Sequence, residues 1–436
     1  MNGLQGLGRW VVAAAILAGL MVALALIHGL VSERSSHRER AVQRVAASHA
    51  GPQRLTGPLR VVPWVETRQV RLDGDVVEAR EQRGFVVQEP VDFRAGGQLL
   101  PQLRRSGVYE VPVYRWQGQL QARFEPWQLP AHPGRVYGQP YLVLGMSDVR
   151  GLVGMPQLRI DGQATPMQPG SRELSAATPG VHAPLLPARS DSLAATSVAV
   201  DLGLAGTRSL AVVPVGQDNH IALRSSWPHP AFDGQFLTAE PPRVDASGFQ
   251  ADWRIPALAS TVSEQLRPAL EQGRLGSLEQ VRVSLVEPVD VHVQALRATK
   301  YGFLFVLLTL TLFGVYDLVR RLRLHPVQYL LVGLALVIFF LLLLSLAEHL
   351  PFVVAYLAAS LACIVLQAWY LAGVLRSWRQ ALGFAALLSS LYGALYGLLV
   401  SQNLSLLLGT LLLFVVLTVV MGLTRSLGWQ RLETGT

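Results

Sequence analysis

Continuous apolar runs stand near both ends of this chain and leave a large middle region with a different pattern. One run lies at Trp10–Val31. The other five are Tyr301–Leu318, Tyr329–Ala347, Pro351–Leu375, Ala381–Val400 and Leu404–Leu423. Each is close to the ~20 residues that a helix needs to cross a bilayer. The pattern predicts an α-helical transmembrane bundle of six spans, one before and five after the middle region.

Arginine in the short links predicts how these spans are oriented. The basic links carry Arg320, Arg321 and Arg323, then Arg376 and Arg379, and finally Arg425 and Arg431 in the tail. The intervening links, Glu348–Leu350 and Ser401–Asn403, contain no lysine or arginine. Short basic loops stay in the cytoplasm. We therefore expect a multi-pass protein of the cell inner membrane with residues 1–9 and 424–436 in the cytoplasm and residues 32–300 in the periplasm.

Arginines after the first span oppose this orientation, because Arg34, Arg38, Arg40 and Arg44 follow it while only Arg9 precedes it. Long loops translocate largely regardless of their charge, so the short links decide the prediction. Ala23-Leu24-Ala25 resembles a cleavage site for a signal peptide. The apolar run continues beyond it to Val31, which favours an uncleaved anchor over residues 10–31.

Residues 32–300 show short apolar or alternating runs bounded by glycine and proline, which is typical of strands. The runs are Arg60–Val65, Val108–Tyr114, Gln119–Phe124, Tyr141–Met146, Ser197–Leu204, Ser209–Val213, His220–Leu223, Phe249–Arg254 and Val281–Val286. They predict a β-rich, antiparallel, sandwich-like domain of one or two subdomains, with the Pro/Gly-rich stretch 163–190 as the best boundary. Helices are expected at Ser32–Ser48, continuing the first span, and at Ser260–Gln272 with Glu264 as a capping partner.

Composition and charge add little beyond topology. Of the 436 residues, 51% are hydrophobic and 15% charged, and the formal net charge is +8. No basic stripe interleaved with aromatic residues occurs, so we expect no nucleic-acid partner. The lipid bilayer is the expected partner, together with other envelope proteins or lipids. The single cysteine, Cys363, lies in a predicted span, so residues 32–300 contain no disulfide.

Local catalytic signatures are missing from the sequence. Lys300, the single lysine, is followed by tyrosine, which excludes a phosphate loop and any Ser-x-x-Lys pair. No His-Glu-x-x-His zinc motif and no Gly-x-Ser-x-Gly elbow occurs. These absences predict a non-enzymatic protein without a cofactor.

Scattered histidines and aspartates could still converge on a metal. The candidates are His182, His220 and His229 with Asp148, Asp233 and Asp252. Three imidazoles and a carboxylate would suit zinc, but these spacings match no compact ligand pattern. We expect no metal site here.

The segment Ser226–Gly234 combines aromatic, polar and proline residues. Trp227, His229 and Phe232 could form a contact loop for another envelope component. The alternative, which we favour, is a rigid loop whose Trp227 and Phe232 plug the end of the sheet core.

Two further motifs indicate structural roles. In Ser147–Gly151, Asp148 is expected to cap a turn at a strand end and Arg150 to pair with a carboxylate. Gly393 and Gly397 form a small-xxx-small face that predicts close packing between membrane helices.

Several segments, in order along nearly the whole chain, resemble the CreD family of inner-membrane proteins of Gram-negative bacteria. They are Gly57–Pro63, Gly107–Tyr114, Ser147–Gly151, Trp227–Phe232, Arg297–Phe305, His325–Ala335 and Ala355–Leu357. Asp317 departs from the glutamate that the family pattern leads us to expect. The resemblance implies a cell-envelope integrity protein controlled by a two-component system, linked to colicin tolerance and β-lactam stress. It implies no catalytic residue.

Three functional hypotheses follow from these observations. The first is a non-enzymatic protein that supports envelope integrity and the stress response through its periplasmic β-rich domain. The second is a transporter or lipid-handling protein with a groove in the five-helix bundle of residues 301–423. The third and least favoured is an envelope hydrolase that uses the scattered histidines and aspartates.

Overall fold

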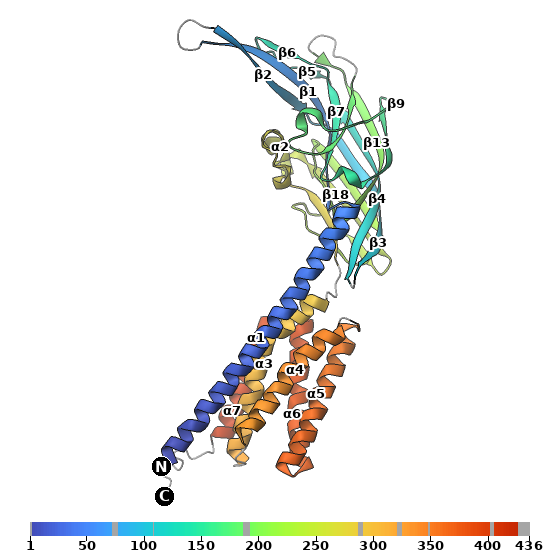
Figure 1. Cartoon of the computed structure of the whole chain (residues 1–436). Coiled ribbons are helices and arrows are strands. Elements are labelled where there is room, and N and C mark those ends of the chain that lie inside the picture. The colour runs from blue at the N-terminus through green and yellow to red at the C-terminus, as the bar shows by residue number, and fades with distance from the viewer. Residues whose placement is uncertain are drawn as a thin grey trace. The chain divides into compact units, whose positions relative to one another are not determined.

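The computed structural model describes residues 2–71, 77–107, 109–185, 192–286, 291–320, 325–347, 349–401 and 405–425. The chain forms two compact units (Figure 1). The membrane unit comprises Met1–Glu39 and Val289–Thr436, and the β-rich unit comprises Arg40–Pro288. The first helix, α1 (Asn2–His49), contributes residues to both.

Long apolar helices build the membrane unit. After α1 they are α3 (Val291–Arg320), α4 (Pro326–Ala347), α5 (Phe352–Leu375), α6 (Trp378–Val400) and α7 (Ser405–Thr424). Within the described residues, five helices are long and apolar enough to span a membrane: α1, α3, α4, α5 and α6. The corresponding apolar stretch of α7 is shorter, Leu407–Gly422. The predicted class, apolar helices at both ends of the chain around a β-rich domain, is confirmed, with five spans meeting this criterion instead of six.

Aromatic side chains from several helices hold the membrane unit together. The Tyr392 ring lies 4.7 Å from the rings of Phe305 and Phe339, measured between centroids. The Tyr356 hydroxyl donates a hydrogen bond to the Tyr392 carbonyl at 2.7 Å. Helices α3, α4, α5 and α6 therefore share one packed centre.

Two large sheets form the β-rich unit. The first sheet has the order β10-β11-β7-β1-β14-β19-β16, with β2 and β6 also paired to β1. Its strands are β1 (Gln53–Arg71), β2 (Val77–Gln88), β6 (Arg135–Tyr137), β7 (Tyr141–Met146), β10 (Gln168–Pro169), β11 (Gly180–Pro184), β14 (Ser209–Val212), β16 (Pro230–Phe232) and β19 (Val281–Leu285). β5 (Trp127–Gln128) and β12 (Ser192–Leu193) form a separate small pair.

The second sheet has the order β17-β18-β15-β3-β4-β13-β8-β9. Its strands are β3 (Asp92–Ser106), β4 (Tyr109–Phe124), β8 (Leu152–Ile160), β9 (Gln163–Thr165), β13 (Thr196–Thr207), β15 (Asp218–Ser225), β17 (Arg243–Asp245) and β18 (Gly248–Pro256). The inner faces of the two sheets share one hydrophobic core.

Most strand pairs are antiparallel, as predicted, but the sheets are mixed, because two pairs are parallel. β1 pairs with β14 in parallel, and β3 pairs with β15 in parallel. Parallel neighbours need a long crossover connection. These strands come from distant parts of the chain, so no hairpin signal between them exists in the sequence.

Trp116 is one of the two tryptophans in the core shared by the sheets and is fully buried. It fits because Gly97 and Gly118 lack a Cβ atom. A Cβ built at Gly118 would lie 2.2 Å from the indole ring, and one at Gly97 would lie 2.6 Å from its Nε1 atom. The two glycines therefore create the space that the indole occupies.

The Pro/Gly-rich stretch 163–190 does not divide the domain. It carries β9 of the second sheet and then β10 and β11 of the first sheet, while residues 186–190 lie outside the described residues. The stretch therefore connects the sheets within a single compact unit.

Helix α2 (Val262–Gln272) forms as predicted, but Glu264 is not its cap. The carboxylate of Glu279 accepts hydrogen bonds from the Thr261 amide at 2.8 Å and from the Ser260 hydroxyl at 3.1 Å. The cap partner comes from a later segment, which a local capping motif cannot reveal.

Candidate binding surface

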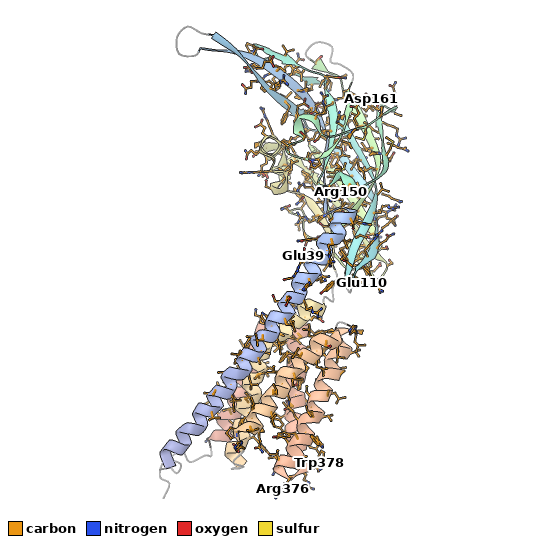
Figure 2. All side chains as sticks on the ribbon, viewed as in Figure 1. Glu39, Glu110, Arg150, Asp161, Arg376 and Trp378 are labelled. Atoms are coloured by element: carbon orange, nitrogen blue, oxygen red, sulfur yellow. The ribbon has the colours of Figure 1, made fainter. Side chains whose placement is uncertain are left out.

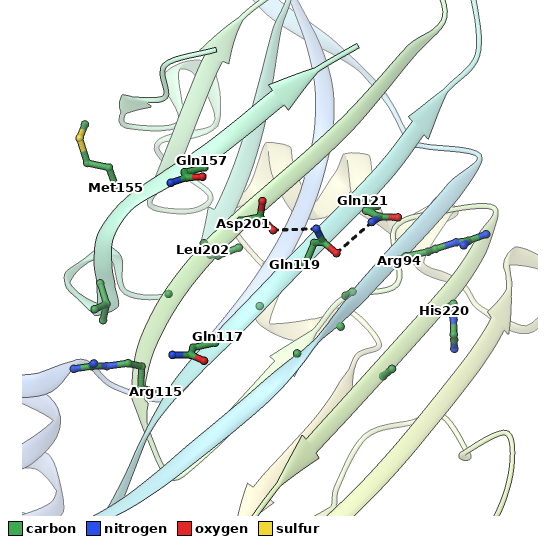
Figure 3. Close-up of a pocket in the computed structure, with 17 residues that line it drawn as sticks. Arg94, Arg115, Gln117, Gln119, Gln121, Met155, Gln157, Asp201, Leu202 and His220 are labelled. Atoms are coloured by element: carbon green, nitrogen blue, oxygen red, sulfur yellow. Dashed lines mark hydrogen bonds between the residues drawn. The ribbon is translucent and has the colours of Figure 1, made fainter. Parts of the chain in front are cut away.

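The outer face of the second sheet contains a cavity of about 880 Å³ (Figure 3). Strands β3, β4, β8, β13 and β15 line it. Its volume lies in the range of ligand sites, which is about 300–1,000 Å³. It is therefore the strongest candidate site among the described residues.

Small residues form the floor of this cavity. Gly96 of β3 and Ala222 of β15 lie on neighbouring strands, and Gly203 lies on β13, on the other side of β4. A Cβ built at Gly96 would meet only the Ala222 carbonyl oxygen, at 3.8 Å. The floor is thus open because the side chains are short, and the fold does not require glycine at position 96.

Strand β4 supplies the most regular feature of the surface, which we call the arginine–glutamine row. Alternate residues of a strand point to the same face. The row consists of Arg115, Gln117, Gln119, Gln121 and Arg123, which are all exposed, while Trp116, Leu120, Ala122 and Phe124 between them are buried. Arg123 is eight positions after Arg115, which corresponds to roughly 26 Å, because a strand rises about 3.3 Å per residue.

Hydrogen bonds fix the middle of the row (Figure 3). Gln121 Nε2 donates to Gln119 Oε1 at 3.3 Å, and Gln119 Nε2 donates to Asp201 Oδ1 at 3.0 Å. The other oxygen of Asp201 accepts from Arg159 Nη2 at 2.6 Å. Asp201 is therefore neutralised by Arg159, and the two amides are held in a defined order.

An arginine stands at each end of the row, and Asp92 of β3 lies opposite Arg123. Arg94, on the adjacent strand, pairs with Asp92 at 3.3 Å. Within the part of the chain that the structure describes, Arg115 and Arg123 make no ion pair. The face therefore carries more arginines than carboxylates, with Arg115 at one end of the row and Arg123, opposite Asp92, at the other.

A second cavity of about 330 Å³ continues the same face. It shares Arg94 and Gln121 with the first cavity and adds Arg123, Arg159 and Ser197. The two hollows together follow the full length of the arginine–glutamine row.

The last turns of α1 cover the start of this face. Val42 and Val45 of α1 form a hydrophobic cluster with Val111 and Val113 of β4. Arg115 follows Val113 on the same side of the strand. The open part of the face therefore begins where the α1 contact ends.

The turn Ser147–Gly151 holds the end of α1 in place. The Asp148 carboxylate accepts from Arg150 Nη2 at 2.7 Å, from Arg150 Nε at 2.9 Å and from the Gly51 amide at 3.2 Å. Arg150 Nη1 donates to the Ala47 carbonyl at 2.8 Å, and Figure 2 shows Arg150 beside the end of α1. Asp148 thus caps the short 3-10 helix Val149–Gly151, and Arg150 pairs with it.

Replacing Asp148 with alanine is expected to destabilise the β-rich unit by about 1 kcal/mol at pH 7, the usual cost of losing such a cap. The hydrogen bonds from Arg150 hold the pKa of Asp148 below its usual value. The stabilisation is therefore complete above the ordinary aspartate pKa of about 3.9 and is lost as the pH falls through the lower pKa of the folded state. Urea unfolding midpoints at pH 7 and pH 3 measure this difference.

The variant Asp148→Asn separates the charge from the cap. It keeps one side-chain oxygen, which can still accept from the Arg150 amide as Oδ1 does. It removes the ionisable group together with Oδ2, the acceptor of the Gly51 amide. Its loss of stability relative to the natural protein should shrink as the pH falls. A constant difference between pH 7 and pH 3 would contradict the assigned role of the Asp148 charge.

The predicted contact loop packs largely on the core. Trp227 is half-buried, and its Nε1 donates to the Val286 carbonyl at 2.9 Å. The Phe232 ring packs edge-to-face on Phe249 and Trp253, with centroids 5.8 Å and 5.9 Å apart. His229 is exposed. This geometry matches the plug that we favoured and leaves His229 as the accessible member of the loop.

Among the described residues, Gly393 and Gly397 do not pack closely against another helix, unlike the predicted role. A Cβ built at either position meets nothing within 4 Å. Tyr392 and Leu395 are the buried residues of this part of α6. Large side chains therefore fill the packing face, and the small residues lie away from it.

The candidate metal ligands are separated by the fold. His182 lies in β11 of the first sheet and His220 in β15 of the second sheet. His182 Nδ1 donates to the Gly170 carbonyl at 2.8 Å, and His220 lies 3.7 Å from Asp252. Among the described residues, no group of three metal-ligating side chains occurs.

The arginine–glutamine row was not predicted from the sequence. Its signal is the segment Arg115-Trp116-Gln117-Gly118-Gln119-Leu120-Gln121-Ala122-Arg123, in which every second residue is polar. Only its second half was predicted as strand, because Gly118 interrupts the apolar alternation.

Comparison with known proteins agrees with the fold. A family model described as "Inner membrane protein CreD" matches residues 7–430. The Inner membrane protein CreD of Escherichia coli (strain K12) is 35% identical over 379 residues, covering 86% of this chain and 82% of that protein. The chain therefore belongs to the CreD family of inner membrane proteins.

Proposed function

We propose that this protein is a non-enzymatic inner-membrane protein that supports envelope integrity and the response to envelope stress. Its β-rich unit would face the periplasm and contact other envelope components. The observation that carries the proposal is the polar outer face of the second sheet, with its two cavities and with Arg115 and Arg123, which make no ion pair among the described residues. That face offers hydrogen bonds and charge for recognition.

The chemistry of this face supports binding over catalysis. General acid–base hydrolysis needs carboxyl or imidazole groups placed as a working pair. The carboxylate among the lining residues of the larger cavity, Asp201, is held by Gln119 and Arg159. The imidazole in the cavity lining belongs to His220. The carboxylate beside it, Asp252, is not among the lining residues.

Deletion of the gene tests the proposal. We expect greater sensitivity to detergent and to β-lactams, and expression of the natural chain should restore resistance. The variant Arg115→Gln should restore it only in part, because the charge at one end of the row is missing. A deletion strain that matches its parent under several envelope stresses would remove the proposal.

A second candidate, a transporter or lipid-handling protein, is favoured by Gln367 in α5. Its side chain is 2% exposed, and among the described residues neither amide atom has a hydrogen-bond partner. An unpaired amide among membrane helices is costly and is often kept for function. If it serves a passing ligand, Gln367→Leu should leave the protein folded and abolish complementation of the deletion strain. Full complementation by that variant would exclude this role.

A further inference from the structure

We propose that the arginine–glutamine row binds an extended glycan chain that carries carboxylates. The proposal rests on the proposed function, because it places the row in the compartment that holds envelope polysaccharides. It follows from the length of the row, the charges at its ends, the amides between them and the open floor beside it.

The charges at the two ends call for an anionic ligand of some length. Arg115 and Arg123 make no ion pair within the described chain and lie roughly 26 Å apart on one strand. A guanidinium binds a carboxylate through two parallel hydrogen bonds. A small anion could engage one arginine only, whereas a chain with repeated carboxylates can engage both.

The amides between the arginines suit hydroxyl and acetamido groups. Each glutamine amide has donors and an acceptor, which matches groups that also donate and accept. The Gln119–Gln121–Asp201 bonds orient two of these amides. The side chains of Gln117 and Gln157 make no hydrogen bond within the described chain and remain free for a ligand. The low floor at Gly96 and Ala222 leaves room for sugar rings beside them.

Other polymers fit this surface less well. Single-stranded nucleic acid needs aromatic platforms for its bases, and no aromatic residue lines the larger cavity. Peptides add to sheet edges or insert side chains into apolar pockets, whereas β4 is an inner strand between β3 and β13. Acyl chains need an apolar lining, and Met155 and Val153 at one margin provide little of it.

Four oligosaccharides of matched length separate the possible ligand groups. An oligomer of N-acetylglucosamine and N-acetylmuramic acid carries acetamido groups and carboxylates. Chitohexaose carries only the acetamido groups, oligogalacturonate only the carboxylates, and maltohexaose neither. Binding to the full-length protein in lipid nanodiscs can be measured by isothermal titration calorimetry. We expect the first oligomer to bind most tightly and maltohexaose to bind least.

Three variants locate the binding. Arg115→Gln should weaken binding of the muramic acid oligomer about ten-fold, the effect of one lost charged hydrogen bond. It should leave chitohexaose binding unchanged. Gly96→Leu should fold normally, since a Cβ at this position makes only an ordinary contact. It should abolish binding because the leucine side chain fills the floor of the cavity. The matched control is Arg254→Gln on β18, an exposed arginine outside both cavities, which should bind as the natural protein does.

The outcomes decide both the proposal and the source of the glycan. Tighter binding of the muramic acid oligomer than of oligogalacturonate assigns cell-wall glycan, and equal binding assigns another acidic polysaccharide. Binding no tighter than that of maltohexaose, or binding unaffected by both Arg115→Gln and Gly96→Leu, overturns the proposal. If the deletion strain is sensitive while no glycan binds, the proposed function stands and the ligand assignment falls. If glycan binds while deletion has no effect, the ligand assignment stands and the proposed role in envelope integrity falls.

Discussion

Replacing Trp116 with alanine is expected to destabilise the β-rich unit by about 4 kcal/mol, because truncating a buried tryptophan leaves a large cavity. Trp116 is 0% exposed and lies in the core shared by the two sheets. Gly97 and Gly118 cannot fill the space that the indole vacates. Pulse proteolysis of the full-length protein across a urea gradient measures the loss as a lower unfolding midpoint.

A matched glycine variant makes this prediction sharper. Gly118→Ala should itself cost about 1–3 kcal/mol, since its Cβ would lie 2.2 Å from the Trp116 ring and overpacks the core. In the Trp116→Ala background the same alanine gains space, so the double variant should lose less stability than the sum of the two single losses. Gln117→Ala, on the outer face of the same strand, should change stability by less than about 0.5 kcal/mol. Additive losses at positions 116 and 118 would show that the indole does not occupy the space over Gly118.

The membrane helices were predictable because their signal is local. A span is recognised from the length and composition of one segment, and the predicted runs coincide with α1 and α3–α7 to within a few residues for most boundaries. The first span is the main exception. Its helix continues past the membrane run to His49, as the predicted extension Ser32–Ser48 requires.

The arrangement of strands was not predictable in the same way. Most of the predicted runs fall on strands, but β4 was split at Gly118, and β2, β3 and β8 were missed. Pairing between β1 and β14 joins Gln53–Leu55 to Leu210–Val212. Nothing in either segment of a single sequence indicates that it pairs with the other. The mixed topology is therefore seen only in the structure.

The candidate surface shows the same limit at the level of side chains. Polar alternation on β4 is visible in the sequence, but the importance of the row depends on neighbours. Arg159 of β8 neutralises Asp201 of β13, and Asp92 of β3 neutralises Arg94. Only these contacts, together with their absence at Arg115 and Arg123 within the described chain, show where charge remains available.

The turn Ser147–Gly151 could be predicted from the sequence, whereas the packing face of α6 could not. Asp148 and Arg150 lie two residues apart, so their pairing could be inferred from sequence. The Gly393–Gly397 pattern indicates only which face could approach a neighbour. On α6 the approach is made by the opposite, larger residues, including Tyr392.

A cysteine at position 131 is expected to be labelled from outside the inner membrane, whereas a cysteine at position 377 should be protected. Ala131 is exposed in the β-rich unit, and Ser377 lies between Arg376 and Trp378 in a basic link. Short links that carry arginine are expected to stay on the cytoplasmic side, so the link with Arg376 and Arg379 should be protected. Both variants are built on Cys363→Ala, which removes the one natural cysteine, a buried residue.

Spheroplasts treated with a membrane-impermeant maleimide give the readout. Ala131→Cys should react fully before lysis and Ser377→Cys only after the membrane is permeabilised. The Cys363→Ala parent should remain unlabelled in both conditions, which controls for background. Protection of position 131 together with early labelling of position 377 would place the β-rich unit in the cytoplasm. The glycan proposal would then lose its compartment, because its ligand and the arginine–glutamine row would lie on opposite sides of the membrane.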